Sequence, residues 1–150
     1  MKKSILNFIL LSGLSIGAIA NDRFIRDDSK DIVVDTTTNL MWQDNSDASD
    51  TNSKKTWQSA ISYCENLTLG GYNDWHLPNF NELYYLANKD KYNPAIDDGF
   101  KYVVRSYYWS STTFASNTSY AWYISFGSGY SYDKPKTGSE YVRCVRLADN

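Results

Sequence analysis

The chain contains 150 residues with a mass of 17.2 kDa, a size that predicts one domain. Hydrophobic residues make up 42% and charged residues 21%, and with a mean hydropathy of -0.52 this composition excludes a disordered chain and an integral membrane protein. The net charge of -2 argues against a general nucleic-acid-binding protein, because such proteins normally carry a basic face.

The first twenty residues have the features of a secretory signal peptide. Two lysines near the start are followed by an apolar run, and Ala18 and Ala20 supply the small side chains of a cleavage site. The run is too short, and too interrupted by polar residues, for stable insertion in a membrane. We therefore expect residues 1–20 to be removed and residues 21–150 to form an exported domain that is periplasmic or secreted.

The mature chain begins with predicted strands. Residues 32–42 (IVVDTTTNLMW) indicate two strands joined by a polar turn at residues 35–39. Residues 44–55 contain no apolar side chain except Ala48 and predict a solvated loop.

A helix is expected after this loop, with Thr56 as its N-cap. Its apolar residues recur at spacings of 3, 1, 3 and 3, which places them on one helical face. They are Trp57, Ala60, Ile61, Cys64 and Leu67. Gly70 and Gly71 are expected to end this helix.

A second helix is predicted after Pro78. Asn79 followed three residues later by Glu82 is a capping-box pattern. The expected buried face consists of Phe80, Leu83, Tyr84 and Ala87. Residues 89–98 contain turn-forming residues and predict a connector.

The rest of the chain predicts strands. We expect them at residues 103–104, 107–112, 119–127, 130–133 and 140–147. In the last of these, Val142 and Cys144 should face one way and Tyr141 and Val145 the other. Two helices followed by an antiparallel sheet give an α+β fold class.

The mature chain retains two cysteines, Cys64 and Cys144. In an oxidising compartment, an even pair in a small domain predicts a structural disulfide. The alternatives are a catalytic thiol or a metal site, but a metal would need more ligands than two cysteines and the single histidine. In the simple chain-entropy model, such a bridge is worth about 4–5 kcal/mol.

Several motifs in order resemble a known family. They are W-x-x-A-x-x-Y-C from Trp57, G-G-Y-N-D-W-H-L-P-N-x-x-E-L from Gly70, Y-W-S-S-T from Tyr108, and V-R-C-V-R from Val142. Together they resemble the bacterial domain of unknown function DUF1566, also called the Lcl C-terminal domain, over approximately residues 28–147.

The resemblance implies a C-type lectin-like, or formylglycine-generating-enzyme-like, fold. In this fold two helices pack on a twisted antiparallel sheet, and the resemblance also supports a bridge between the helical cysteine and the last strand. The family usually has W-R-L-P where this chain has His76. An ion pair made by that arginine, for example with Glu82, must become a histidine contact here.

We expect no enzymatic activity. Enzymes of this fold that oxidise a substrate cysteine to formylglycine need a reactive cysteine pair, whereas Cys64 and its partner are predicted on core faces. His76 could nominally form a triad with a serine and an acid, but no G-x-S-x-G motif accompanies it. We interpret His76 as a structural residue.

We expect no cofactor. C-type lectins bind calcium and sugar through E-P-N or Q-P-D followed by W-N-D, and none of these occurs in the chain. Asp44, Asp47 and Asp50 recur every three residues without the Gly and terminal Glu of an EF-hand, and Asp97 and Asp98 form a further acidic pair. We interpret each as part of a solvated loop, so no motif supports calcium.

The 13 Tyr, 5 Trp and 6 Phe remain to be explained. We expect the tryptophans to serve packing: Trp57, Trp75, Trp109 and Trp122. A rigid sheet that presents Tyr, Asn and Ser provides stacking area and adaptable hydrogen bonds at low entropic cost, and neighbouring lysines suit an acidic or sulfated glycan. The candidate ligand-binding residues are Tyr107, Asn117, Tyr123, Tyr130, Tyr132, Lys134 and Lys136. Ordinary packing on both faces of the sheet stays open as the alternative.

These observations predict an exported, non-enzymatic, lectin-like domain that recognises a glycan or another cell-surface ligand in adhesion or surface recognition. The alternative is a periplasmic structural domain that docks to a protein partner. An enzyme of the formylglycine-generating-enzyme-like group is the third hypothesis.

Overall fold

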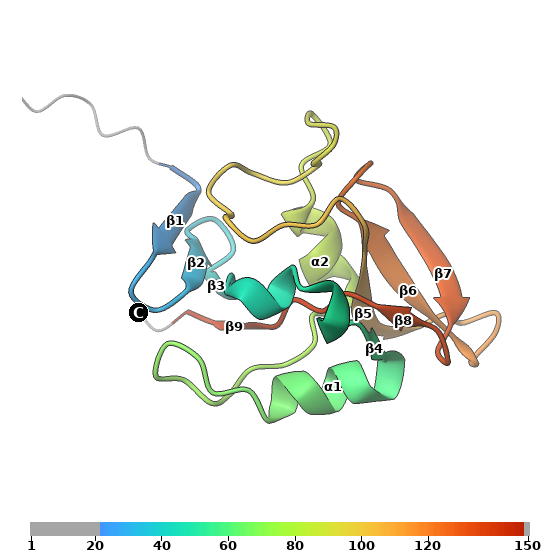
Figure 1. Ribbon diagram of the computed structural model, residues 1–150. Helices are drawn as coiled ribbons and strands as arrows, with labels where there is room; N and C mark the ends of the chain where they lie inside the picture. The colour runs from blue at the N-terminus through green and yellow to red at the C-terminus, as the bar shows by residue number, and fades with distance from the viewer. Residues whose placement is uncertain (1–21, 149–150) are drawn as a thin grey trace, which may run out of the picture.

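The computed structural model describes residues 22–148. The predicted signal peptide, including Ala18 and Ala20, lies outside the described residues. Figure 1 shows helix α2 between two antiparallel sheets, with helix α1 running along the bottom of the view. Within residues 22–148, neither helix has the length and hydrophobicity needed to cross a bilayer.

The α+β fold class is confirmed: along the described chain, four strands precede the two consecutive helices and five strands follow them. The helices are α1 (Trp57–Glu65) and α2 (Phe80–Leu86), and two single 3-10 turns are η1 (Ser46–Ala48) and η2 (Thr51–Ser53). The strands are β1 (Phe24–Asp27), β2 (Ile32–Asp35), β3 (Leu40–Gln43), β4 (Lys55–Thr56), β5 (Tyr107–Thr113), β6 (Tyr120–Ser125), β7 (Ser131–Pro135), β8 (Ser139–Glu140) and β9 (Val145–Leu147).

The strands divide among three antiparallel sheets. The first has the order β1-β2-β3-β9, the second pairs β4 with β8, and the third has the order β5-β6-β7. The predicted pair of strands within residues 32–42 is confirmed as β2 and β3. Strand β1 was not predicted, because its four residues (FIRD) have neither a run of β-branched residues nor a clear alternation.

The first helix ends earlier than expected. Asn66 caps it, because its backbone N–H and its side-chain amide both donate to the carbonyl of Ser62, at 3.1 and 2.7 Å. The prediction that Gly70 ends the helix and that Leu67 belongs to it is therefore wrong. Gly70, with a positive φ of 62°, instead lies in the tight turn that links Leu69 to Tyr72.

The second helix begins as predicted. The side chain of Asn79 accepts from the backbone N–H of Glu82 at 2.9 Å, and the carboxylate of Glu82 accepts from the backbone N–H of Asn79 at 2.8 Å. The buried face differs in part from the prediction: Leu83 and Leu86 are buried within the helix, whereas Phe80 is only partly buried. Leu86 was missed because the helix faces a sheet on each side.

Residues 103–104 were predicted to form a strand but belong to an irregular segment. Val103 and Val104 are partly buried against the core, and the backbone N–H of Val104 donates to the hydroxyl of Tyr108 at 3.1 Å. A side-chain hydroxyl thus replaces the strand partner that the two β-branched residues suggest. The connector over residues 89–98 is confirmed as a segment without helix or strand.

The C-terminal segment is two short strands rather than the single closing strand predicted over residues 140–147. Between β8 and β9 the chain runs through the centre of the molecule, where both of its faces are buried. Tyr141 and Val145 join the core around α2, whereas Val142 and Cys144 join the core beside α1. The predicted alternation is therefore correct, but neither face reaches solvent.

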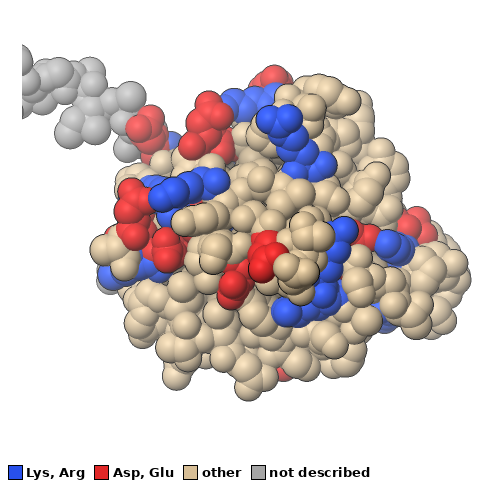
Figure 2. Space-filling view, in the orientation of Figure 1, with Lys and Arg blue, Asp and Glu red and all other residues tan. Residues whose placement is uncertain are grey.

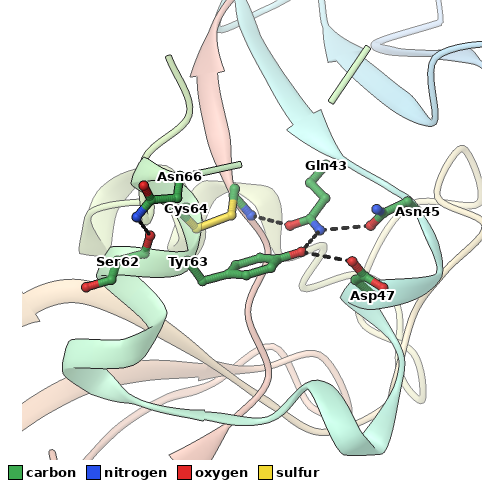
Figure 3. Close-up of a disulfide and its surroundings, with 8 residues drawn as sticks. Gln43, Asn45, Asp47, Ser62, Tyr63, Cys64 and Asn66 are labelled. Carbon is green, nitrogen blue, oxygen red and sulfur yellow. Dashed lines mark hydrogen bonds between the residues drawn. A yellow bond between two sulfur atoms is a disulfide. The ribbon is translucent and has the colours of Figure 1, made fainter. Parts of the chain in front are cut away.

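The predicted disulfide joins Cys64 of α1 to Cys144, 80 positions along the chain. Figure 3 shows Gln43 beside it: the side chain accepts from the backbone N–H of Cys144 at 3.0 Å and donates to the hydroxyl of Tyr63 at 2.9 Å. That hydroxyl donates to Asp47 at 3.2 Å. Burial and the nearby Asp47 carboxylate raise the pKa of Tyr63 to about 12. The Tyr63 hydroxyl therefore stays protonated at neutral pH.

Asp44 corrects the expectation of a fully solvated loop over residues 44–55. Its carboxylate is completely buried and accepts from Arg143 at 2.9 Å and from Arg26. It also accepts from the backbone N–H groups of Lys101 and Tyr102, at 2.8 and 3.0 Å. Local composition could not reveal this burial, because every partner of Asp44 lies in another part of the chain.

Candidate functional site

Three of the predicted tyrosines form one cluster, which we call the tyrosine cluster: Tyr107 of β5, Tyr123 of β6 and Tyr132 of β7. Tyr123 and Tyr132 lie directly opposite each other in the strand register. Their rings stack with centroids 5.9 Å apart, and Tyr107 meets both rings edge-on, at 4.9 and 6.2 Å. The cluster therefore spans all three strands of the sheet on one face.

The tyrosine cluster presents polar atoms that the protein does not use. Tyr107 is 40% exposed and Tyr132 is 44% exposed. Among the described residues, none of the three hydroxyls has a hydrogen-bond partner. Burial, with smaller contributions from Tyr107 and the Glu140 carboxylate, raises the pKa of Tyr123. This hydroxyl is therefore protonated at neutral pH and can both donate and accept.

A rigid base supports the tyrosine cluster. Trp109 is completely buried, and its ring meets the edge of Tyr123 with centroids 6.0 Å apart. The indole N–H of Trp109 donates to the backbone carbonyl of Lys55 at 2.9 Å, which ties β5 to β4. Trp109 therefore holds Tyr123 from behind, and Tyr123 in turn contacts the rings of Tyr107 and Tyr132.

Lys134 lies on the same face of β7 as Tyr132, as predicted, but its charge is neutralised. Its ammonium group forms an ion pair with Glu140, whose side chain is only 4% exposed. The same carboxylate acts electrostatically on Tyr123. Lys134 therefore adds no unpaired positive charge beside the tyrosine cluster.

The other predicted residues lie away from the tyrosine cluster. Lys136 donates to Thr113 at 2.8 Å and its ammonium lies 3.9 Å from the ring centroid of Trp57, in a separate hollow beside α1. Asn117 lies in the turn between β5 and β6, where its side chain accepts from the backbone N–H of Ser119 at 3.1 Å. Tyr130 precedes β7, is 65% exposed, and has no ring contact within the described residues.

Charge does not dominate the face shown in Figure 2. Lysine and arginine side chains alternate with aspartate and glutamate over the strands and loops, and the lower part, over α1, is almost free of charge. No broad area of one sign is visible on this face. Strong steering of a highly charged ligand toward this face is therefore not expected.

The histidine contact expected from the sequence is present. The Nε2 atom of His76 lies 3.4 Å from a carboxylate oxygen of Glu82. Burial alone would raise the pKa of Glu82, but the hydrogen bonds from His76 and from the backbone of Asn79 outweigh it and lower that pKa. Within the described part of the chain, the imidazole has no serine hydroxyl as a partner.

The predicted acidic positions do not converge. Within residues 22–148, no three His, Cys, Asp or Glu side chains lie together as a metal site requires. Asp44 faces Arg143, Asp47 accepts from Tyr63, and Asp50 accepts from the backbone N–H of Asn52 at 2.9 Å. The three aspartates, although they recur every three residues in the sequence, therefore each bind a different partner.

Sequence reasoning missed a second aromatic surface, around Trp122 on the opposite face of β6. This tryptophan was expected to be a packing residue, but it is only partly buried and lines a hollow with Phe80 and Thr112. The signal that pointed to it is the alternation in β6, which puts Trp122 and Tyr123 on opposite faces. One of the two large rings therefore lies on each side of the sheet.

The fold defines an α+β domain with a buried disulfide and an aromatic sheet surface. A comparison with protein-family models finds a match to the Lcl C-terminal domain over residues 31–146. The chain belongs to the Lcl C-terminal domain family, as the motifs in its sequence indicate. No curated protein matches the chain.

Proposed function

We propose that this protein is an exported, non-enzymatic, lectin-like domain that binds a glycan on a cell surface, in adhesion or surface recognition. The single observation that carries the proposal is the tyrosine cluster. It combines partly exposed rings, hydroxyls without partners and a rigid base. No other predicted site residue adds a comparable feature.

The chemistry of the tyrosine cluster suits a sugar. One face of a pyranose ring is a set of C–H groups that packs on an aromatic ring, and the edge of the sugar carries hydroxyls that need donors and acceptors. Tyrosine supplies both kinds of contact with little loss of side-chain freedom. Tyr107 and Tyr132 are the two rings most accessible to such a ligand.

The charges favour a neutral glycan over an acidic or sulfated one at this place. Lys134 is already paired with Glu140, and Lys136 lies beside Trp57 rather than beside the tyrosines. A sulfate at the tyrosine cluster would therefore meet a neutral pair and not a free cation. The lysines, which in the sequence suggest an acidic ligand, do not carry that role together.

A glycan array of the exported, disulfide-bonded protein tests the proposal. Binding should survive chelation of calcium, because no motif supports a calcium site. Tyr132→Ala should weaken binding about 10-fold, the effect of losing ~1.4 kcal/mol from a central aromatic contact. Tyr92→Ala is the matched control, because Tyr92 is 80% exposed and has no ring partner within the described residues.

Three other outcomes overturn parts of the proposal. Equal loss in both variants would show that the tyrosine cluster is not the site. Loss of all binding on chelation would assign calcium a role and contradict the proposal. A blank array, together with a specific protein captured by crosslinking through the tyrosine cluster, would favour the alternative of a domain that docks to a protein partner. Tyrosine-rich surfaces are equally common at protein–protein interfaces.

Export has its own test. The N-terminal residue of the protein recovered outside the cytoplasm should be Asn21 if cleavage follows Ala20. Replacement of Ala18 and Ala20 by large residues should leave the precursor uncleaved. Recovery of the protein only inside the cell, with its N-terminus intact, would contradict export.

A further inference from the structure

The hollow around Trp122 has the composition of a sugar-binding subsite. It has a volume of about 370 Å³ and is lined by Asn79, Phe80, Asn81, Thr112 and Trp122. None of these five side chains is ionisable. Clefts for small ligands are typically of this size and combine apolar walls with a few polar groups.

Phe80 and Trp122 form the apolar wall of the hollow, and they belong to a row of four rings. Trp122 contacts Phe114 edge-on at 5.1 Å and Phe80 at 5.3 Å, and Phe80 stacks on Tyr84 at 5.3 Å. Each ring is partly buried and held by its neighbours. Trp122 is therefore fixed by contacts on two sides, as a platform for a flat ligand must be.

The polar groups beside Trp122 have unused hydrogen-bonding capacity. The side chain of Asn79 accepts from the backbone of Glu82, and the NH₂ group of Asn79 has no acceptor within the described residues. The amide of Asn81 and the indole N–H of Trp122 likewise have no partner there. Thr112 accepts from the backbone N–H of Phe80 at 2.9 Å, so its own proton is free to donate.

A second, smaller hollow continues from the first, because both are lined by Asn79 and Asn81. It has a volume of about 190 Å³, and its wall includes Trp42 together with the charged side chains of Arg23, Asp35 and Glu82. The Trp42 side chain is 1% exposed, and its Nε1 has no hydrogen-bond partner within the described residues. A buried N–H without an acceptor is costly and rare.

We propose that the two hollows together bind neutral sugar residues of one glycan chain, with a pyranose ring on Trp122 and hydroxyls on Asn79 and Asn81. This inference rests on glycan binding as the function of the domain, but it uses residues separate from the tyrosine cluster. Alternation along β6 places Trp122 and Tyr123 on opposite faces, so the sheet carries a binding surface on each side.

A titration of the ¹⁵N-labelled, disulfide-bonded protein with cellotetraose, chitotetraose and maltotetraose tests this site. Each sugar is added to about 10 mM, which populates even a site with a Kd near 1 mM. We expect at least one sugar to shift the indole signal of Trp122 and the side-chain amide signals of Asn79 and Asn81. These shifts should persist in Tyr132→Ala, which removes only the other surface.

Variants separate binding from folding. Trp122→Ala should abolish the shifts, and Asn81→Ala should weaken binding about 2- to 10-fold, the effect of one lost hydrogen bond. Asn81 is exposed and has no partner in the described protein, so this change leaves the fold intact. Asn52→Ala is the control, because Asn52 is an exposed asparagine that lines neither hollow.

The remaining outcomes are decisive. Shifts confined to β7 around Tyr132 would support sugar binding at the tyrosine cluster and contradict sugar binding in the hollow around Trp122. Shifts at Trp122 without any at Tyr132 would support sugar binding in the hollow around Trp122 and contradict the tyrosine cluster as the main binding site. If none of the three sugars shifts the Trp122 signal, or if the signal depends on protein concentration alone, the proposal of a sugar site at Trp122 is wrong.

Discussion

Asp44 and Arg143 form an ion pair in which both side chains are completely buried, with a carboxylate oxygen and a guanidinium nitrogen 2.9 Å apart. Arg143 directly precedes the disulfide-bonded Cys144, and Asp44 directly follows Gln43, which binds the backbone of Cys144. The ion pair and the disulfide therefore hold the same two segments together. Their contributions can be tested separately.

Removal of Asp44 should be among the most damaging single changes in the described chain. In Asp44→Ala, Arg143 stays buried without its carboxylate, and breaking a buried pair in this way costs about 3–5 kcal/mol. Urea unfolding followed by tryptophan fluorescence measures the loss. Asp98→Ala is the control, because Asp98 pairs with Lys91 at the surface and its removal should cost no more than about 1 kcal/mol. Equal losses in both variants would contradict the role of Asp44.

The disulfide should contribute strongly to stability. Its two cysteines are 80 positions apart, and removal of a native bridge from a small exported domain costs about 2–5 kcal/mol. A reducing agent should therefore lower the Tm of the protein. The double variant Cys64→Ser, Cys144→Ser should have the low Tm from the start and should not respond to the reducing agent, since the chain has no other cysteine. A reductant effect on the double variant would refute this explanation.

Acid should destabilise the fold in part through Glu82. Its pKa is lowered in the folded protein, so the native state binds fewer protons at this site than the unfolded chain does. The resulting stability is fully present above pH 4.5, the ordinary pKa of a glutamate, and is lost as the pH falls through the lower pKa of Glu82 in the folded protein. In Glu82→Gln the free energy of unfolding should fall less steeply below pH 4.5. Glutamine also keeps the capping box intact, so helix α2 is retained. An unchanged slope would disprove this assignment.

His76→Arg should stabilise the protein slightly. An arginine at this position can make two parallel N–H···O bonds to Glu82, and it keeps its charge at every working pH. Because His76 is 47% exposed on its side chain, the gain should not exceed about 1 kcal/mol. Thermal unfolding of this variant measures the gain. His76→Gln, which retains a donor without a charge, should show none, and a gain as large as that of arginine would argue against the ion pair.

Local sequence signals predicted the elements that are determined by near neighbours. The capping box of α2 needs only Asn79 and Glu82, three residues apart, and the β2–β3 pair needs only the turn between its strands. Burial that depends on distant residues was not predictable in this way. The surroundings of Asp44 are polar in sequence, and its partner Arg143 lies 99 positions away.

The candidate site was predictable to the extent that strand alternation determines it. Period-two spacing correctly separated Tyr123 from Trp122, and Tyr132 lies opposite Tyr123 in register. The expectation that Tyr123 lies on a face away from the core was wrong, because Tyr123 packs against the core beside α1. The pairing of Lys134 with Glu140 and the position of Lys136 over Trp57 depend on how β8 and α1 pack, which the spacing of residues does not specify. For the same reason Trp122 was expected to be buried.

The position of β9 beside β3 has a consequence for how the protein is made. A ribosome produces the partners of β3 at very different times: β2 immediately before β3, and β9 only after all the other strands of the domain. Until then the sheet lacks a strand, and the core residues Tyr141 and Val145 are missing. A nascent chain stalled before residue 141 would leave β3 as an open edge, to which other chains can pair. The four-stranded sheet therefore cannot be completed until β9 has been synthesised.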